Sequence, residues 1–364
     1  MLFVSPRDFY YYWVIGRLLL TGGNPYDPQQ MSNYFISLGS LPGDWEFVQL
    51  NYPPIFLLFF IPFSYFSLET ALLLWSLFSI FACSFITFLG VKWCIREYNP
   101  TKTTIFLMIV SAIFTWWLDF FWNQSCFLPF CGILGFLITN RKKPLISGIL
   151  FSLLFIKPHL SLAFWVAVFT RKLIEREWRF FIGLVLALGF LLITTTILFP
   201  FLIPQCVERL PLILAASYTY MGISLIQLLS ILYDVRWPIL TLSLSLFCAV
   251  TGVIYGFKKR FSLLSFTGLI PLSILLSPHA MPHSIILAIP SLWYWLICTF
   301  KEDKQNHIAK VFITFWIVTI IYDGGWNPWI NEMLAALLLI LSARPLINIL
   351  SKPKDTELKI TDKF

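Results

Sequence analysis

Side chains able to transfer a proton or bind a phosphate group are concentrated in a few short stretches of this chain. Asp8 lies in the aromatic run Arg7-Asp8-Phe9-Tyr10-Tyr11-Tyr12-Trp13, and Asn123-Gln124 follows a tryptophan-rich turn. Histidine is the side chain whose ordinary pKa lies closest to neutral pH. Three of the four histidines, His159, His279 and His283, fall in segments that we assign below to one side of a membrane. A proton-transfer or phosphate-binding site on that side would need such residues.

Lys157 has the most unusual position of these residues, because it interrupts a long apolar run at 144–170 and precedes Pro158. A lone charge inside such a run is energetically costly, and residues of this kind usually have a function. An ammonium group donates hydrogen bonds and carries positive charge, so a phosphate group is a suitable ligand for it. The alternative is that Lys157 extends to the membrane interface and has no further role.

The elements that must position these residues follow from composition. Apolar residues make up 58% of the 364 residues and charged residues 12%, with a mean hydropathy of +0.80. Soluble domains are about 25% charged. In lipid, an open-ended chain satisfies its backbone polar groups by forming helices. The sequence therefore predicts an all-α integral membrane protein. Its seven cysteines form no CxxC pair, which argues against a zinc site or a disulfide framework.

Basic residues mark one end of the predicted helices. The apolar runs lie near 69–91, 103–121, 125–140, 144–170, 178–203, 237–256, 261–277, 283–300, 308–322 and 330–350. Basic clusters between these runs, together with Arg344 and the Lys-rich tail, hold 21 of the 26 Lys and Arg residues, which places these segments in the cytoplasm. This placement explains the net charge of +8 without nucleic acid. The outer loops are then the first 52 residues and those near 119–124, 204–236, 277–283 and 322–329.

Two runs need a separate interpretation. Residues 144–170 have basic clusters at both ends and so cross an even number of times. Pro158 divides the run into half-helices of about a dozen residues, so we predict a broken hairpin with Lys157 at its tip. Residues 53–66 contain three prolines, and we interpret them as a re-entrant or interfacial helix. The total is about eleven membrane segments in one domain, residues 1–350, followed by a cytoplasmic tail at 351–364.

The amino-terminal segment is unusual, because residues 1–52 are expected outside although no signal peptide precedes them. Either this segment is translocated unaided, or a crossing helix precedes Met1 in the complete protein. We favour the second explanation.

Several of these motifs resemble one known family. The segments Asp8-Phe9-Tyr10, Gly22-Gly23-Asn24-Pro25-Tyr26 and Tyr52-Pro53-Pro54 are similar to the opening of glycosyltransferase 87 proteins. Asn123-Gln124, Ile156-Lys157-Pro158 and Ser277-Pro278-His279 recur in the order and rough spacing of that family. The resemblance covers about residues 7–290. It departs from the family at the start, where a first helix precedes the aspartate loop of enzymes with this GT-C type of fold.

The resemblance implies a hexosyltransferase of the cell membrane with its site on the outer face. Its donor would be a polyprenyl-phosphate sugar, mannose-like, and its acceptor a lipid or glycan. Asp8 fits the role of general base, and Lys157 fits the binding of the donor phosphate. His279 is the next candidate for binding the phosphate or for positioning the acceptor. Asn123, Gln124, Tyr52 and His159 are further candidates for substrate binding. Because the leaving group is a phosphate monoester, neither a metal nor another cofactor is required.

Other interpretations remain open at this stage. The chain would instead be a transporter or flippase of lipid-linked sugars if the break at Lys157-Pro158 serves translocation, or it would be an inactive relative. Asp8 and Asn123-Gln124 would then cap helices, and His279 and His283 would be loop residues without a role. Asp119 and Asp323 are predicted to be solvated loop carboxylates.

Overall fold

The computed structural model describes residues 7–39, 52–121, 123–216, 224, 238–258, 263–277, 280 and 282–301. Every regular element within these ranges is a helix. In chain order the elements are α1 (Arg7–Leu20), α2 (Pro28–Ser37), α3 (Pro54–Leu57), α4 (Ile61–Ser64), α5 (Leu68–Tyr98), α6 (Lys102–Phe121), α7 (Phe127–Thr139), α8 (Pro144–Phe151), η1 (Ser152–Ile156), η2 (Pro158–Ser161), α9 (Leu162–Ile174), α10 (Trp178–Leu198), α11 (Leu202–Ala216), α13 (Pro238–Phe257), α14 (Leu263–Phe266), α15 (Leu269–Leu275), η3 (Pro282–Ala288) and α16 (Ile289–Lys301).

The membrane character of the fold is confirmed, but the expected count of about eleven segments is not. Within the described ranges, three helices are long and apolar enough to cross a membrane, at Leu68–Tyr98, Trp178–Leu198 and Ile239–Phe257. The bent pair around Lys157 is a fourth candidate if it counts as one span. Shorter apolar helices contribute the rest of the bundle. The runs expected at 308–322 and 330–350 lie outside the described residues.

Helix α5 shows how such a sequence folds in lipid. Its buried residues form one stripe with a spacing of three or four, the period at which residues share a helix face. The stripe contains mainly small or polar side chains in addition to Trp75, and it consists of Ala71, Trp75, Ser79, Cys83, Thr87, Gly90, Val91 and Cys94. Large apolar side chains on the other faces are exposed, among them Phe81 and Phe88. This pattern is expected of a helix that packs on protein along one side and on lipid elsewhere.

The break predicted within residues 144–170 is confirmed. The segments Pro144–Ile156 and Pro158–Ile174 are bent by 120° relative to each other, with Lys157 at the break. Pro158 offers no backbone N–H to continue the helix, and the residue before a proline avoids the helical region. Lys157 accordingly has an extended φ of −134° and a ψ of 67°. Short 3₁₀ segments, η1 and η2, adjoin the break on both sides.

The proline-rich segment 53–66 forms two one-turn helices, α3 and α4, rather than one continuous helix. Both pack against α1, and α4 also contacts the beginning of α5. The Trp13 indole N–H donates to the Phe66 carbonyl at 3.1 Å, and the Ser64 hydroxyl donates to the Trp13 carbonyl at 3.3 Å. These bonds fix the segment against α1, which carries Asp8.

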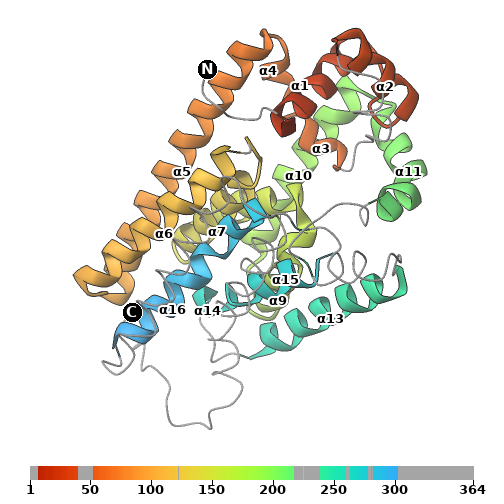
Figure 1. Ribbon diagram of the computed structural model, residues 1–364. Helices are drawn as coiled ribbons and strands as arrows, with labels where there is room; N and C mark the ends of the chain where they lie inside the picture. Colours follow the sequence, from red (N-terminus) through yellow and green to blue (C-terminus); the bar gives the residue numbers. More distant parts are fainter. Residues whose placement is uncertain are drawn as a thin grey trace.

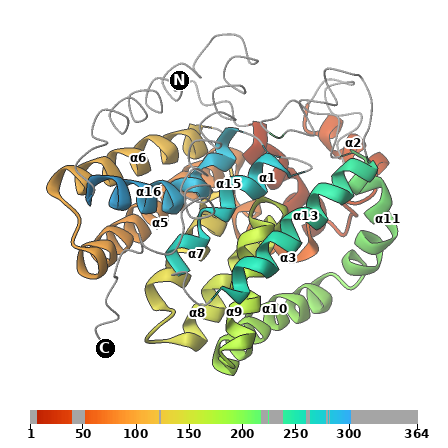
Figure 2. The ribbon, with the colours of Figure 1, turned by 90° about the horizontal axis from the view of Figure 1, so that it is seen from below.

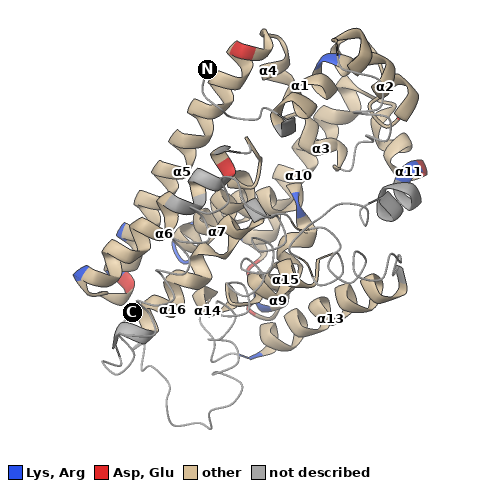
Figure 3. Cartoon of the chain, in the orientation of Figure 1, with Lys and Arg blue, Asp and Glu red and all other residues tan. Residues whose placement is uncertain are grey.

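The helices α1–α4 lie together at one end of the molecule, close to the start of α5 (Figure 1). Helix α3 also contacts α10 and α11, so the segment after α10 reaches the same end. The ends of α5, α9 and α13 that carry Lys and Arg lie away from this region (Figure 3). On another side of the bundle, α6 packs against α5 and α16 (Figures 1 and 2). The charge pattern predicts this arrangement for the described segments, and which end faces outward stays a prediction.

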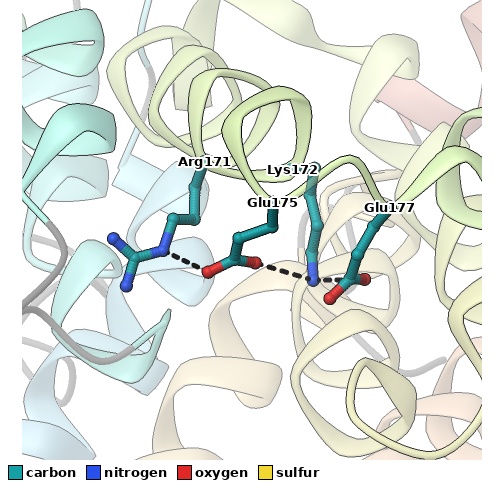
Figure 4. A network of polar contacts seen from close by, with 4 residues as sticks. All are labelled: Arg171, Lys172, Glu175 and Glu177. Carbon is teal, nitrogen blue, oxygen red and sulfur yellow. Dashed lines mark hydrogen bonds and ion pairs between the residues drawn. The ribbon is translucent and has the colours of Figure 1, made fainter.

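A polar network lies at the end of α9 and in the turn that leads into α10 (Figure 4). The Lys172 ammonium, with its side chain 1% exposed, lies 2.7 Å from a Glu177 carboxylate oxygen and 3.8 Å from one of Glu175. Arg171 pairs with the other oxygen of Glu175. The Glu177 backbone N–H donates to the Lys172 carbonyl at 3.0 Å and closes the turn. Part of this predicted basic cluster is therefore neutralised by neighbouring carboxylates.

Candidate active site around Lys157

Lys157 is buried at the tip of the bent hairpin, with 5% of its surface exposed. Its ammonium donates to Gln124 Oε1 at 3.1 Å and to Cys126 Sγ at 3.3 Å. It also lies 5.6 Å from the centre of the Tyr52 ring, within the range of a cation–π contact. Three parts of the chain that are far apart in sequence thus meet at one cation. The structure brings together three of the predicted site residues: Lys157, Gln124 and Tyr52.

The turn between α6 and α7 positions Gln124. Asn123 adopts a left-handed conformation with φ of +49°, which Asn tolerates better than most residues. Its side-chain oxygen accepts a hydrogen bond from Ser76 of α5 at 3.2 Å. The Gln124 backbone N–H donates to the Asp119 carbonyl at 3.0 Å. Asn123 therefore shapes the turn, and Gln124 provides the side-chain contact to Lys157.

Asp119 does not match its predicted environment. We expected a solvated loop carboxylate, but Asp119 lies in α6 and is 2% exposed. The reason is that α6 continues to Phe121, so Asp119 belongs to the helix rather than to the loop that follows it. Its charge acts on the Lys157 ammonium at a distance, although Lys157 makes no ion pair within the described part of the chain. The prediction of a solvated side chain was wrong.

Two motifs near the amino terminus, Asn24-Pro25-Tyr26 and Tyr52-Pro53-Pro54, are joined through their tyrosines. The Asn24 side chain accepts from the Tyr26 backbone N–H at 3.0 Å, which forms a local turn. The Tyr26 hydroxyl then donates to the Tyr52 carbonyl at 2.7 Å. Burial raises the pKa of Tyr26 well above its usual range, so it stays a neutral donor. This bond fixes the backbone that carries the Tyr52 ring.

Tyr12 of α1 completes the connection to Lys157. Its hydroxyl lies 2.8 Å from the Tyr52 hydroxyl and donates to Gln124 Oε1 at 3.1 Å. Its ring is 1% exposed and stacks on Phe60 with 4.3 Å between ring centres. Sequence reasoning assigned Tyr12 only to an interfacial aromatic run and did not select Cys126. The one signal for Tyr12 was its position four residues after Asp8, one helical turn further along the same face.

The remaining predicted residues are less fully described. Asp8 lies in α1, one turn before Tyr12, and only its backbone is described. His159 lies in η2 two residues after Lys157 and is half-buried. His283 lies in η3, and nothing of its side chain is described. His279 and Asp323 lie outside the described residues. Whether Asp8, Lys157 and His279 meet in one cavity therefore stays a prediction.

A bundle of apolar helices around a buried cation, with a helix broken at that cation, defines an integral membrane protein with an internal polar site. Comparison of the chain with protein-family models identifies its family. The model of glycosyltransferase family 87 matches residues 50–278, more than half of the chain, and the chain belongs to this family. It is therefore a glycosyltransferase with sugar donors and acceptors as its partners.

The match includes Tyr52, Asn123, Gln124, Lys157 and His159, and it leaves Asp8 and His279 outside. Comparison with curated proteins and with solved structures found no match.

Proposed function

We propose that this glycosyltransferase moves a hexose, mannose-like, from a polyprenyl-phosphate donor to a hydroxyl of a lipid or glycan acceptor at the outer face of the cell membrane. The observation that carries the proposal is the Lys157 ammonium. It is buried and hydrogen-bonded to neutral groups, and it forms no ion pair among the described residues. A buried charge without a direct ion pair is expensive. Asp119 acts on the ammonium only from beyond ion-pair distance, so the phosphate of the donor would supply a negative charge in direct contact.

The two hydrogen bonds of Lys157 support this role. An ammonium group has three donors. Gln124 takes one, and the weak acceptor Cys126 takes another. Within the described part of the chain the third has no protein acceptor, so a phosphate oxygen would find both a charge and a donor. A bond from a cation to a phosphate is about twice as strong as one between neutral groups.

The reaction needs a base as well as a site for the leaving group. The acceptor oxygen forms a bond to the anomeric carbon while the bond from that carbon to the phosphate oxygen breaks, and its electron pair stays on the polyprenyl phosphate. The acceptor proton passes to a carboxylate, for which we propose Asp8. Asp8 lies in α1, one turn before Tyr12, and this spacing supports the proposal because the Tyr12 hydroxyl donates to the Gln124 oxygen that also accepts from Lys157. His279 is proposed as a further phosphate ligand, and Asn123 and His159 as residues that bind substrate.

Exchange of Asp8 tests the assigned base. Asp8→Asn keeps the shape of the side chain and removes its basicity, so we expect transfer to fall by at least about 100-fold. Binding of the donor should change by less than about threefold, because the base interacts mainly with the acceptor proton. Transfer of radiolabelled hexose and binding of donor, each measured in nanodiscs, give the two values. Glu69→Gln, near the start of α5, is the matched control. Transfer by Asp8→Asn at the parent rate would show that the base is another residue, with Asp119 the next candidate.

A further inference from the structure

We propose that Tyr12 is a positioning residue that holds the Lys157 ammonium in place for the donor phosphate, and that it acts through Gln124. This inference rests on the proposed function, because it assumes that Lys157 binds phosphate. Tyr12 does not contact Lys157 directly in the hydrogen bonds described above. Its effect passes through the amide that the two residues share.

The direction of the hydrogen bonds follows from the donors available. An ammonium group has no acceptor, so the Gln124 atom that faces Lys157 must be the carbonyl oxygen Oε1. The Tyr12 hydroxyl lies 3.1 Å from the same oxygen and must therefore be the donor. A hydroxyl has a single hydrogen, so Tyr12 accepts from the Tyr52 hydroxyl, 2.8 Å away. The chain of bonds runs from Tyr52 to Tyr12 to Gln124, where it meets the bond from Lys157.

This arrangement fixes the orientation of Gln124. Its oxygen accepts from both Tyr12 and Lys157, which matches the two acceptor positions of a carbonyl. Rotation of the amide would place its NH₂ group against the Lys157 ammonium and also against the Tyr12 hydrogen. Gln124 is 4% exposed, so water cannot easily replace either partner. Without Tyr12, only one donor would hold the amide that orients the ammonium.

Packing gives Tyr12 the rigidity that a positioning residue needs. Its ring stacks on Phe60 and meets the rings of Phe56 and Tyr52 edge-on, each at 5.5 Å between centres. Tyr26 holds the Tyr52 backbone from the other side. The hydroxyl of Tyr12 is thus directed at Gln124 by the packing of α1 on α3 and α4. Tyr12→Phe keeps the ring contacts and removes the hydroxyl alone.

A double-mutant cycle on the full-length protein in nanodiscs tests the inference, with a polyprenyl phosphate that carries no sugar as the probe. Loss of one net hydrogen bond predicts that Tyr12→Phe raises the Kd for this lipid about fivefold. Lys157→Ala should raise it further, and adding Tyr12→Phe to Lys157→Ala should then have no additional effect. A residue with a purely structural role would weaken binding equally in both backgrounds. Tyr34→Phe, the same change on α2, is the matched control and should leave the Kd unchanged.

The outcomes separate this inference from the proposed function. If Tyr12→Phe leaves the Kd unchanged in the parent protein, or weakens binding equally with and without Lys157, Tyr12 is not a positioning residue for the ammonium. If Lys157→Ala binds the lipid as tightly as the parent, the phosphate role of Lys157 is wrong and the inference fails with it. If Lys157→Ala weakens binding and the effect of Tyr12→Phe disappears in its presence, both are supported.

Discussion

At the scale of single residues, the contrast between two buried lysines is the most informative feature. Lys172 has two carboxylates within 4 Å, as expected of a lysine that stabilises the fold. Lys157 has the neutral partners Gln124 and Cys126 instead. Desolvation of a buried ammonium costs on the order of several kcal/mol, and hydrogen bonds to neutral partners recover only part of this free energy. This contrast supports the proposed role of Lys157 in binding a ligand rather than in stabilising the fold.

Replacement of each lysine by methionine tests this interpretation. Lys157→Met removes a buried charge without an ion pair and keeps most of the volume, so we expect the protein to gain about 1 kcal/mol of stability while losing transfer. Lys172→Met should lower the stability by about 1–2 kcal/mol, a modest loss because Glu175 and Glu177 are both about a third exposed and remain hydrated. Thermal unfolding in detergent, read as the midpoint temperature, measures both changes. A lower midpoint for Lys157→Met than for Lys172→Met would contradict the interpretation.

At the scale of elements, close helix contacts hold the hairpin that presents Lys157. Helix α13 packs along α9, the second arm of the hairpin. Gly252 and Gly256 of α13 face α9, and a Cβ added to Gly252 would lie 2.5 Å from the Ala163 carbonyl oxygen. Small residues with this spacing allow helix backbones to approach closely in membranes. The second arm of the hairpin is therefore held by a close approach of two helix backbones.

A pair of alanine variants tests the contribution of that contact. Gly252→Ala requires α13 to move away from α9, and we expect a loss of about 1–3 kcal/mol, as is usual for overpacked cores. Gly189→Ala in α10 is the control, because an added Cβ there meets nothing within 4 Å and alanine favours a helix. Midpoints of thermal unfolding should therefore fall for the first variant and stay level or rise for the second. Equal midpoints for the two would show that the α9–α13 contact does not hold the hairpin.

At the scale of the whole molecule, the sequence predicted features that depend on local pattern. Helical class, most helix positions and the break at Lys157-Pro158 followed from apolar runs, basic clusters and the geometry of proline. Lys157, Gln124 and Tyr52 were each selected as substrate ligands, but the sequence predicted no contact among them. Their actual hydrogen bonds were not predictable, because they depend on how α1, α3 and α7 pack around the hairpin.

The errors and omissions have a common physical origin. Asp119 was expected in a loop because it lies near the end of an apolar run, but α6 extends past it and buries it. Tyr12 and Cys126 were not selected because an aromatic residue or a cysteine in an apolar context usually serves packing alone. Helix count depends on length and tilt, which the pattern of short apolar runs does not determine. Tertiary packing decides each of these features.

The central claim is that sugar leaves a polyprenyl phosphate, and the most direct test measures the products of the purified protein in vesicles. Supplied with a polyprenyl-phosphate hexose in the outer leaflet and an acceptor lipid, the parent protein should release one polyprenyl phosphate for each hexose transferred. Lys157→Met should neither release polyprenyl phosphate nor transfer hexose above background. Transfer from a nucleoside-diphosphate sugar alone, or movement of the intact donor between leaflets without release of phosphate, would contradict the account.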